Sequence, residues 1–531
     1  MRAAAVLHLT AGVLLALMAW FVPRRVAQAR LAAPPVLLLD LAPLALAAGL
    51  LGLATARPLF AGVITLTLGA GFALADYTMR QVLREPVVFV EMSELPQVFT
   101  HPHLYLPFAG PGLVVGGAAS ATAGALALLV VEPPLWTPRP VAALVAVVLI
   151  AVAVCLVARE PLLGAAGAAL RRFAPSGEPF ADAAALGPFG MLVVHTAIAR
   201  AERQDRQRVL AAPSVVSRGR ASGPETPIII VQCESFFDAR RLSPRIPRDL
   251  LAEFDACCAS AALFGRFGAP GWGANTMRAE FAVLSGIAES ELGYDRFNPY
   301  YALARVPLES QVWRLRRAGY RTICLHPFDR RFFRRDLAMP ALGFERFLGR
   351  ETLGGSRVPP YFPDPDFADE IMCILDQEGP RTFIFAITMG NHGPWPEKGP
   401  PLDPVLASTF DPAEVPGGGE LLRYLHGLRR SDEMLRVLMD GLAQRGSPGV
   451  LAFYGDHLPS LPRTFEHFGF VESSTDYAIW PGNGTPRPHD LPAHGLAQLV
   501  IDAVLGPAQG ASLPGAAAVP LLDLGACFAQ R

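Results

Sequence analysis

The sequence predicts a polytopic α-helical membrane domain followed by an α/β domain with a mostly parallel central sheet and helices on both faces. The chain of 531 residues is 51% hydrophobic and only 18% charged, and the apolar excess is concentrated in the first third. From Pro227 onward, short apolar runs alternate with longer amphipathic segments, as strands and helices do when they follow one another along a chain. The length also exceeds what one hydrophobic core usually supports, so separate domains are expected.

The N-terminal third contains apolar stretches long enough to cross a bilayer, and they predict about five spans. These stretches are Ala4 to Val22, Val36 to Ala54, Leu59 to Ala75, Leu106 to Val131 and Val141 to Val157. Their length disfavours the alternative of a soluble helical bundle. The first stretch could also be a signal peptide, because Ala27-Gln28-Ala29 resembles a cleavage site. Further spans follow it, so retention as a membrane anchor is favoured.

Positive charges conflict with the expected orientation of these spans. A cytoplasmic N-terminus and an odd number of spans place the C-terminal domain outside the cell membrane. Arg24, Arg25 and Arg30 would then lie outside, against the positive-inside rule.

The predicted domain organisation has four parts. Residues 1–158 form the transmembrane domain, and 159–226 form a juxtamembrane connector whose apolar and charged runs fit one or two interfacial helices. Residues 227–509 form the α/β domain, and 510–531 form a C-terminal tail.

Composition excludes two classes of function. The formal net charge is −1 and no basic run is interleaved with aromatic residues, so we expect no nucleic-acid partner. The seven cysteines show no C-x-x-C pair or other metal-ligand spacing, which indicates neither a zinc knuckle nor a disulfide framework.

The α/β pattern begins with strands and helices that alternate after Pro227. The predicted strands are Ile228 to Gln232, Thr322 to Leu325, Thr382 to Thr388, Val450 to Tyr454 and Tyr477 to Trp480. The predicted helices are Pro307 to Ala318, Phe367 to Gln377, Glu420 to Leu442 and Leu496 to Leu505. Parallel sheets place ligand sites beyond the carboxyl ends of their strands, so the residues after each run are the candidates for function.

Candidate metal ligands follow two of these strands. Glu234 comes directly after the first strand, although a glutamate there could also cap a turn or pair with an arginine. Asp456 and His457 follow a later strand and provide adjacent oxygen and imidazole donors, which suit Zn²⁺ or Mn²⁺. An ordinary surface Asp-His pair is the alternative.

Thr276 lies in the segment Gly271 to Phe281, near a predicted helix N-terminus. Free N–H groups and the helix dipole at such a position favour an alkoxide or a phosphate oxygen. Ordinary helix capping by Asn275 or Thr276 is the alternative explanation.

Together these motifs are similar to those of the lipoteichoic acid synthase and phosphoglycerol transferase family, whose catalytic domain is sulfatase-like and belongs to the alkaline phosphatase superfamily. The residues match, and so does the order of Glu-Ser-Phe, Thr-x-x-x-Glu-Phe and Gly-Asp-His. The resemblance implies that one catalytic divalent ion, Mn²⁺ or Zn²⁺ with Mg²⁺ as a further candidate, is bound by Glu234, Thr276, Asp456 and His457. It also implies that Thr276 is the nucleophile.

Two further motifs resemble the same family and imply substrate contacts. One begins His326-Pro327-Phe328-Asp329 and continues to Arg335-Asp336, and the other surrounds His392. The implied substrate-binding residues are His326, Asp329, Phe333, Arg335 and His392. Arg335 could clamp a phosphate with two hydrogen bonds, or pair with Asp336 or Asp329. Phe333 stands where the synthases carry a tryptophan, so the indole N–H donor is lost.

The resemblance implies a multi-pass protein of the inner or plasma membrane with an extracytoplasmic catalytic domain. It would transfer phosphoglycerol from a membrane phospholipid, through a phospho-threonine, to an envelope glycan, glycolipid or polymer. The alternatives are a phosphoethanolamine transferase, a sulfatase-family phosphoester hydrolase and a non-catalytic envelope sensor. Phosphoethanolamine transferases usually carry a cysteine-containing stretch after their threonine, which here is replaced by Met277 to Phe281. A sulfatase is disfavoured because the chain has no Cys-x-Pro-x-Arg or Ser-x-Pro-x-Arg motif.

Overall fold

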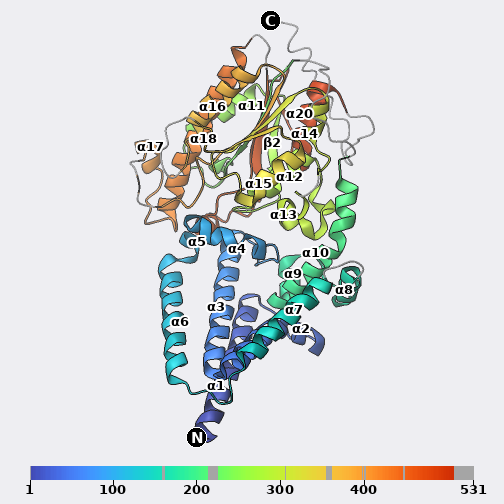
Figure 1. Cartoon of the computed structure of the whole chain (residues 1–531). Coiled ribbons are helices and arrows are strands. Elements are labelled where there is room, and N and C mark those ends of the chain that lie inside the picture. Colours follow the sequence, from blue (N-terminus) through green and yellow to red (C-terminus); the bar gives the residue numbers. More distant parts are fainter. Residues whose placement is uncertain are drawn as a thin grey trace. The chain divides into compact units, whose positions relative to one another are not determined.

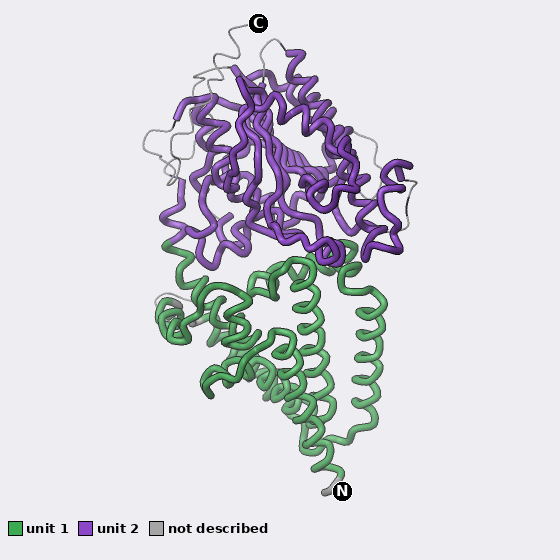
Figure 2. Tube along the Cα trace, turned by 180° about the vertical axis from the view of Figure 1, so that it is seen from behind, with its two compact units in different colours: residues 1–205 green, residues 206–531 purple. Residues whose placement is uncertain are grey.

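A computed structural model describes residues 2–157, 162–212, 225–304, 307–353, 361–396, 399, 402–445, 449–482 and 484–507. It divides into two compact units, Met1–Asp205 and Arg206–Arg531 (Figure 2). The predicted tail, 510–531, lies outside the described residues, and so do residues 213–224 of the predicted connector.

Unit 1 is helical. Its helices are α1 (Arg2–Val26), α2 (Pro34–Thr55), α3 (Pro58–Val82), α4 (Glu91–Thr100), α5 (Pro102–Ala109), α6 (Pro111–Val131), α7 (Pro140–Val157), α8 (Leu162–Leu170), α9 (Pro179–Leu186) and α10 (Pro188–Leu210), the last of which continues into unit 2 (Figure 1). Within the described part of the chain, four helices are long and apolar enough to cross a membrane: α1, α2, α3 and α6. A fifth span results if α9 and α10, bent by 120°, are counted as one broken span. The predicted number of about five spans is therefore confirmed.

Two of the predicted spans differ in detail from the helices. The fourth was expected to begin at Leu106, but the chain breaks at Gly110, whose φ is +77°, and α6 starts at Pro111. A left-handed glycine followed by a proline ends one helix and starts the next. The fifth stretch forms α7, which falls among the shorter apolar helices, with an apolar segment of Pro140–Cys155.

Arg24 lies in a buried polar cluster of unit 1. Its Nη1 donates a 2.7 Å hydrogen bond to Asp40, which is fully buried on α2. Asp40 also accepts hydrogen bonds from Trp20 Nε1 and from the backbone N–H groups of Phe189 and Gly190 at the start of α10. Because its charge is compensated, Arg24 is not a free positive charge at the end of α1.

Unit 2 is built on one mixed sheet, for which the described residues provide nine strands. The order is β4 (Arg346–Leu348), β3 (Arg321–Leu325), β5 (Thr382–Ile387), β1 (Ile228–Cys233), β6 (Val450–Gly455), β7 (Thr475–Trp480), β2 (Leu263–Gly268) and β8 (Arg487–Pro488), with β9 (Leu491–Pro492) also paired to β2. The five strands β4, β3, β5, β1 and β6 run parallel to one another. Strand β7 is antiparallel to both of its neighbours, β6 and β2. The predicted mostly parallel sheet is confirmed, and all five predicted strands are present.

Helices cover both faces of the sheet, as predicted (Figure 1). The longer helices of unit 2 are α11 (Ala252–Ala259), α12 (Thr276–Ser285), α14 (Gln311–Arg317), α15 (Arg335–Leu342), α16 (Asp364–Glu378), α18 (Gly418–Ala443) and α20 (Leu496–Leu505); the short ones are α13 (Pro299–Leu303), α17 (Pro404–Ala407) and α19 (Pro462–His467). Alternate residues of β1 enter different cores. Ile229 and Val231 pack with α16 and α18, whereas Ile228 and Ile230 pack with α12, α14 and α20. A strand buried on both faces reads as a continuous apolar run, which explains its detection from sequence.

Candidate active site

The carboxyl ends of β1 and β6 bring two predicted metal ligands together. The strands pair in parallel with Cys233 opposite Gly455, so Glu234 and Asp456 leave the sheet at adjacent positions. A Cβ on Gly455 would lie 1.7 Å from the carbonyl oxygen of Phe236, which means that only glycine permits this close approach.

Glu234, Asp456 and His457 form a buried group whose potential ligand atoms all lie within 4.8 Å of one another. His457 Nε2 is 3.4 Å from Glu234 Oε1 and 3.6 Å from Asp456 Oδ2. His457 Nδ1 lies 2.9 Å from the carbonyl oxygen of Leu458. Since that oxygen can only accept, Nδ1 carries the proton and the Nε2 lone pair of the neutral ring faces the carboxylates.

This group has the properties of a divalent-metal site. Burial raises the pKa of Glu234 and raises that of Asp456 to about 7, and the Glu234 carboxylate adds to the shift of Asp456. Burial opposes a charge on His457, but the two carboxylates outweigh it and raise its pKa. Asp456 Oδ2 is buried and has no hydrogen-bond partner among the residues that the structure describes. A divalent cation would satisfy this oxygen and compensate both carboxylates, so the residues fit the predicted ion.

Thr276 is the first residue of α12, and its hydroxyl takes part in a tertiary contact. Thr276 Oγ1 accepts a 2.9 Å hydrogen bond from Arg335 Nη2. The preceding Asn275 has a left-handed backbone, with φ of +65°, and its side chain makes no capping hydrogen bond. Capping by Asn275 is therefore not the explanation for this motif.

Arg335 is buried and pairs with Glu280. Its Nε donates a 2.9 Å hydrogen bond to Glu280 Oε2, and its Nη2 donates to Oε1 as well as to Thr276. Glu280 follows Thr276 by four residues, so both side chains lie on one face of α12. The alternative that Arg335 pairs with Asp336 or Asp329 was wrong, because the chain brings α12 against the start of α15.

His326 and Phe333 lie beside Arg335. His326 Nε2 is 3.4 Å from Arg335 Nη1, and its Nδ1 is 3.3 Å from the carbonyl oxygen of Ile387. Burial and the neighbouring guanidinium hold the pKa of His326 well below its ordinary value. The guanidinium carbon of Arg335 lies 5.2 Å from the ring centre of Phe333. Phe333 thus offers a ring face where an indole would add a donor.

His392 and Asp329 differ in their surroundings. Burial lowers the pKa of His392 to about 4, and His457, Asp456 and Arg335 act on it electrostatically, so it belongs to the same neighbourhood. Its Nδ1 is 2.5 Å from the carbonyl oxygen of Gly393. Asp329 instead forms an ion pair with the exposed Arg331, at 3.3 Å.

Two residues that were not predicted from sequence complete the contacts of Glu280, and a third supports one of them. Gln232 Nε2 and the Tyr300 hydroxyl donate to Glu280 at 3.1 and 3.0 Å, and the Tyr454 hydroxyl donates to Gln232 Oε1. Two signals were available. Glu280 stands four residues after Thr276, and Gln232 is a polar residue within an otherwise apolar strand.

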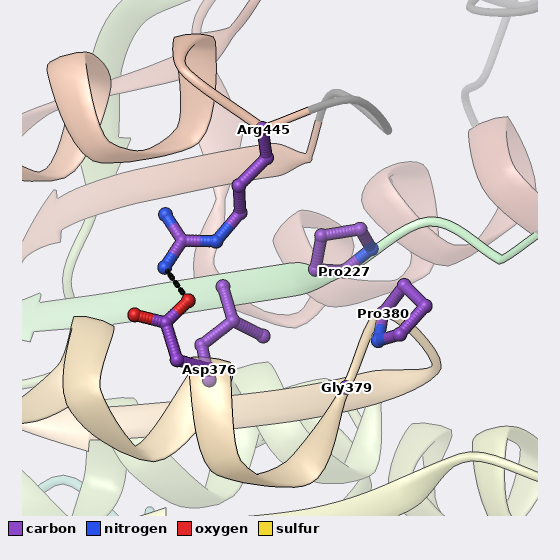
Figure 3. A pocket seen from close by; sticks show the side chains of 6 residues that line it. Pro227, Asp376, Gly379, Pro380 and Arg445 are labelled. Atoms are coloured by element: carbon purple, nitrogen blue, oxygen red, sulfur yellow. Dashed lines mark hydrogen bonds and ion pairs between the residues drawn. The ribbon is translucent and has the colours of Figure 1, made fainter.

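A separate surface hollow of about 300 Å³ lies away from these residues (Figure 3). Its lining residues are Pro227, Leu375, Asp376, Gly379, Pro380 and Arg445, with Asp376 and Arg445 forming an ion pair. Pro227 and Pro380 precede β1 and β5, so the hollow is at the amino ends of the strands. The candidate site is at their carboxyl ends, where parallel sheets bind ligands.

A model of the Sulfatase family matches residues 228–492, a span that includes every strand and every candidate site residue. Unit 2 therefore contains a sulfatase-like domain, residues 228–492. The capsular polysaccharide biosynthesis protein RkpI of Rhizobium meliloti is 29% identical over 440 residues, which cover 80% of this chain and 78% of RkpI. That similarity extends beyond the sulfatase-like domain into unit 1.

Solved structures are also similar to this chain. The integral membrane lipooligosaccharide phosphoethanolamine transferase A (EptA) of Neisseria meningitidis matches with a TM-score of 0.51 and 12% identity, over 94% of each chain. The lipoteichoic acid synthase LtaP of Listeria monocytogenes matches with a TM-score of 0.43 and 20% identity, over 58% of this chain and 78% of LtaP. The match to EptA covers most of this chain, so the similarity of fold is not limited to unit 2.

Proposed function

We propose that this protein is a membrane-anchored, metal-dependent transferase that moves a phosphoglycerol head group from a phospholipid to a cell-envelope acceptor. The observation that carries the proposal is the hydrogen bond from Arg335 to Thr276. The buried group of Glu234, Asp456 and His457 belongs to the same domain. A hydroxyl at a helix N-terminus, next to a buried cation, is suited to act as a nucleophile toward a phosphodiester.

The proposed roles follow from the donor atoms. Glu234, Asp456 and His457 would hold the ion together with the Thr276 hydroxyl. When bound, the ion supplies positive charge that favours loss of the hydroxyl proton and compensates the phosphoryl oxygens. Arg335 supplies a second, fixed positive charge toward the same oxygens.

The proposed reaction proceeds in two displacements. Thr276 Oγ1 forms a bond to phosphorus while the bond from phosphorus to the diacylglycerol oxygen breaks. The proton lost from Thr276 is balanced by the proton gained by the released diacylglycerol. The acceptor hydroxyl then attacks the phospho-threonine, Thr276 regains a proton, and the phosphoglycerol group leaves on the acceptor. Neutral His326 and His392 can hydrogen-bond the oxygens that change charge.

The apolar helices of unit 1 support a lipid donor, because a two-chain lipid stays in the bilayer. The similarity to a capsular polysaccharide biosynthesis protein supports an envelope glycan, glycolipid or polymer as the acceptor. We infer that the chain resides in the inner or plasma membrane with its sulfatase-like domain on the extracytoplasmic side. The ion is expected to be Mn²⁺ or Zn²⁺.

The proposal is tested by trapping the covalent intermediate. Purified protein loaded with Mn²⁺ or Zn²⁺ is incubated with vesicles of phosphatidylglycerol or of phosphatidylethanolamine, without acceptor, and the peptide containing Thr276 is analysed by mass spectrometry. We expect a phosphoglycerol adduct from phosphatidylglycerol. A phosphoethanolamine adduct alone would establish the alternative head group, and turnover without any adduct on Thr276 would overturn the mechanism.

A further inference from the structure

Glu280 is a buried carboxylate whose hydrogen-bonding capacity is completely used. It is 0% exposed, and Arg335 is 2% exposed. Glu280 Oε1 accepts hydrogen bonds from Arg335 Nη2 and Gln232 Nε2. Glu280 Oε2 accepts hydrogen bonds from Arg335 Nε and the Tyr300 hydroxyl. A buried ion pair is retained at a reasonable energetic cost only when such additional hydrogen bonds complete it.

These contacts determine which part of the guanidinium remains for a ligand. Glu280 occupies the Nε and Nη2 edge of Arg335. The second Nη2 hydrogen is directed at Thr276 Oγ1, and Nη1 lies 3.4 Å from His326 Nε2. The terminal Nη1 and Nη2 edge is therefore the one that faces Thr276. The clamp expected for Arg335 must use this edge, since the other is taken.

We propose that Glu280, supported by Gln232 and Tyr300, is a positioning residue that holds Arg335 for the phosphodiester anion reacting at Thr276. This inference rests on the proposed function, because it requires Thr276 to receive the phosphoryl group. Gln232 belongs to β1, and Glu234 directly follows that strand. The same strand therefore positions both a predicted metal ligand and, through Glu280, the arginine. A long arginine side chain without this fixed partner would lose its alignment with phosphorus.

The test compares kcat and KM of the metal-loaded full-length protein with the chromogenic diester bis(p-nitrophenyl) phosphate. Glu280→Gln keeps the size of the side chain but removes its charge, and we expect kcat to fall about 100-fold. Glu280→Asp should restore part of that loss. Metal content, measured by elemental analysis, should stay at the parent's level. Asp432→Asn is the matched control, because Asp432 is another buried carboxylate that accepts two N–H groups, and it should keep the parent's kcat.

The decisive comparison places Glu280→Gln in an Arg335→Ala background. If Glu280 acts through Arg335, the double variant should be no slower than Arg335→Ala alone. An equal fold-loss in both backgrounds, or loss of metal from Glu280→Gln, would overturn the inference.

A milder variant keeps the test valid if Glu280→Gln fails to fold. Tyr300→Phe removes only the hydroxyl that donates to Glu280, and we expect about a five-fold lower kcat in the parent and no change in the Arg335→Ala background. The same loss in both backgrounds would overturn the inference.

The two proposals can fail separately. Turnover by Thr276→Ala at the parent's rate would reject the proposed function, whereas an inactive Thr276→Ala with a fully active Glu280→Gln would reject only the inference.

Discussion

Arg335 Nη2 lies 2.9 Å from Thr276 Oγ1, and this contact joins two helices that are distant in the sequence. The donor comes from the first residue of α15 and the acceptor from the first residue of α12. Because Arg335 donates, the hydroxyl oxygen receives a hydrogen bond while its own proton remains free to leave. The contact therefore prepares the oxygen to carry negative charge.

Replacing Thr276 tests whether this oxygen is the nucleophile. We expect Thr276→Ala to lower phosphodiester turnover by at least about 10³-fold, because loss of a nucleophile removes the covalent route. Thr276→Ser retains the hydroxyl and should keep a measurable part of the rate and the covalent adduct. Steady-state rates and adduct mass spectrometry on both variants provide the measurement, and a fully active Thr276→Ala would contradict the assignment.

Metal removal tests the buried carboxylate group. Dialysis against a chelator should abolish turnover and lower the melting temperature of unit 2, because an ion that binds only the folded state stabilises it. Adding Mn²⁺ or Zn²⁺ should restore both. Asp456→Asn should lower metal occupancy without chelator, whereas Asp432→Asn should not. Stoichiometric metal in Asp456→Asn would show that Asp456 is not a ligand.

The protonation state of His392 makes a pH prediction. Burial lowers its pKa to about 4, so the ring is neutral throughout pH 6 to 8 and becomes charged only near or below its lowered pKa. The ratio of parent to His392→Gln turnover should therefore stay constant across that range. A bound cation would lower the pKa of His392 further, so the ring would still be neutral between pH 6 and 8. A ratio that changes with a midpoint near the ordinary histidine pKa of about 6.5 would contradict this account.

Gly455 tests the convergence of the two strand ends. Gly455→Ala would place a Cβ 1.7 Å from the Phe236 carbonyl oxygen, so the backbone must move and the free energy of unfolding should fall by about 2 kcal/mol or more. Metal affinity should also fall, because Asp456, a predicted metal ligand, directly follows Gly455 and would move with it. Gly484→Ala is the control, since its Cβ would meet no atom within 4 Å. Thermal unfolding and metal titration provide the measurement, and equal stability of both variants would contradict the expected clash.

Several parts of the fold were recognisable because the signal is local. The buried strands β1, β3, β5 and β6 each contain a short apolar run, and most of the spans are long apolar stretches. Strand β2 was missed because it contains Gly265 and a half-buried Arg266, which break the apolar run. Helix α14 begins at Gln311 rather than Pro307, because the Ser310 hydroxyl accepts the N–H of Trp313 and caps it there.

The candidate residues of the site and their order along the chain can be read from the sequence alone. Glu234, Thr276, Asp456 and His457 were selected because their motifs, in this order, resemble those of a known family. The partner of Arg335, in contrast, becomes known only from the folded structure. Asp336 is adjacent in sequence, but Glu280 lies 55 residues away and reaches the guanidinium because α12 and α15 pack on the same face of the sheet. Pairing over such a distance depends on packing, which no local pattern records.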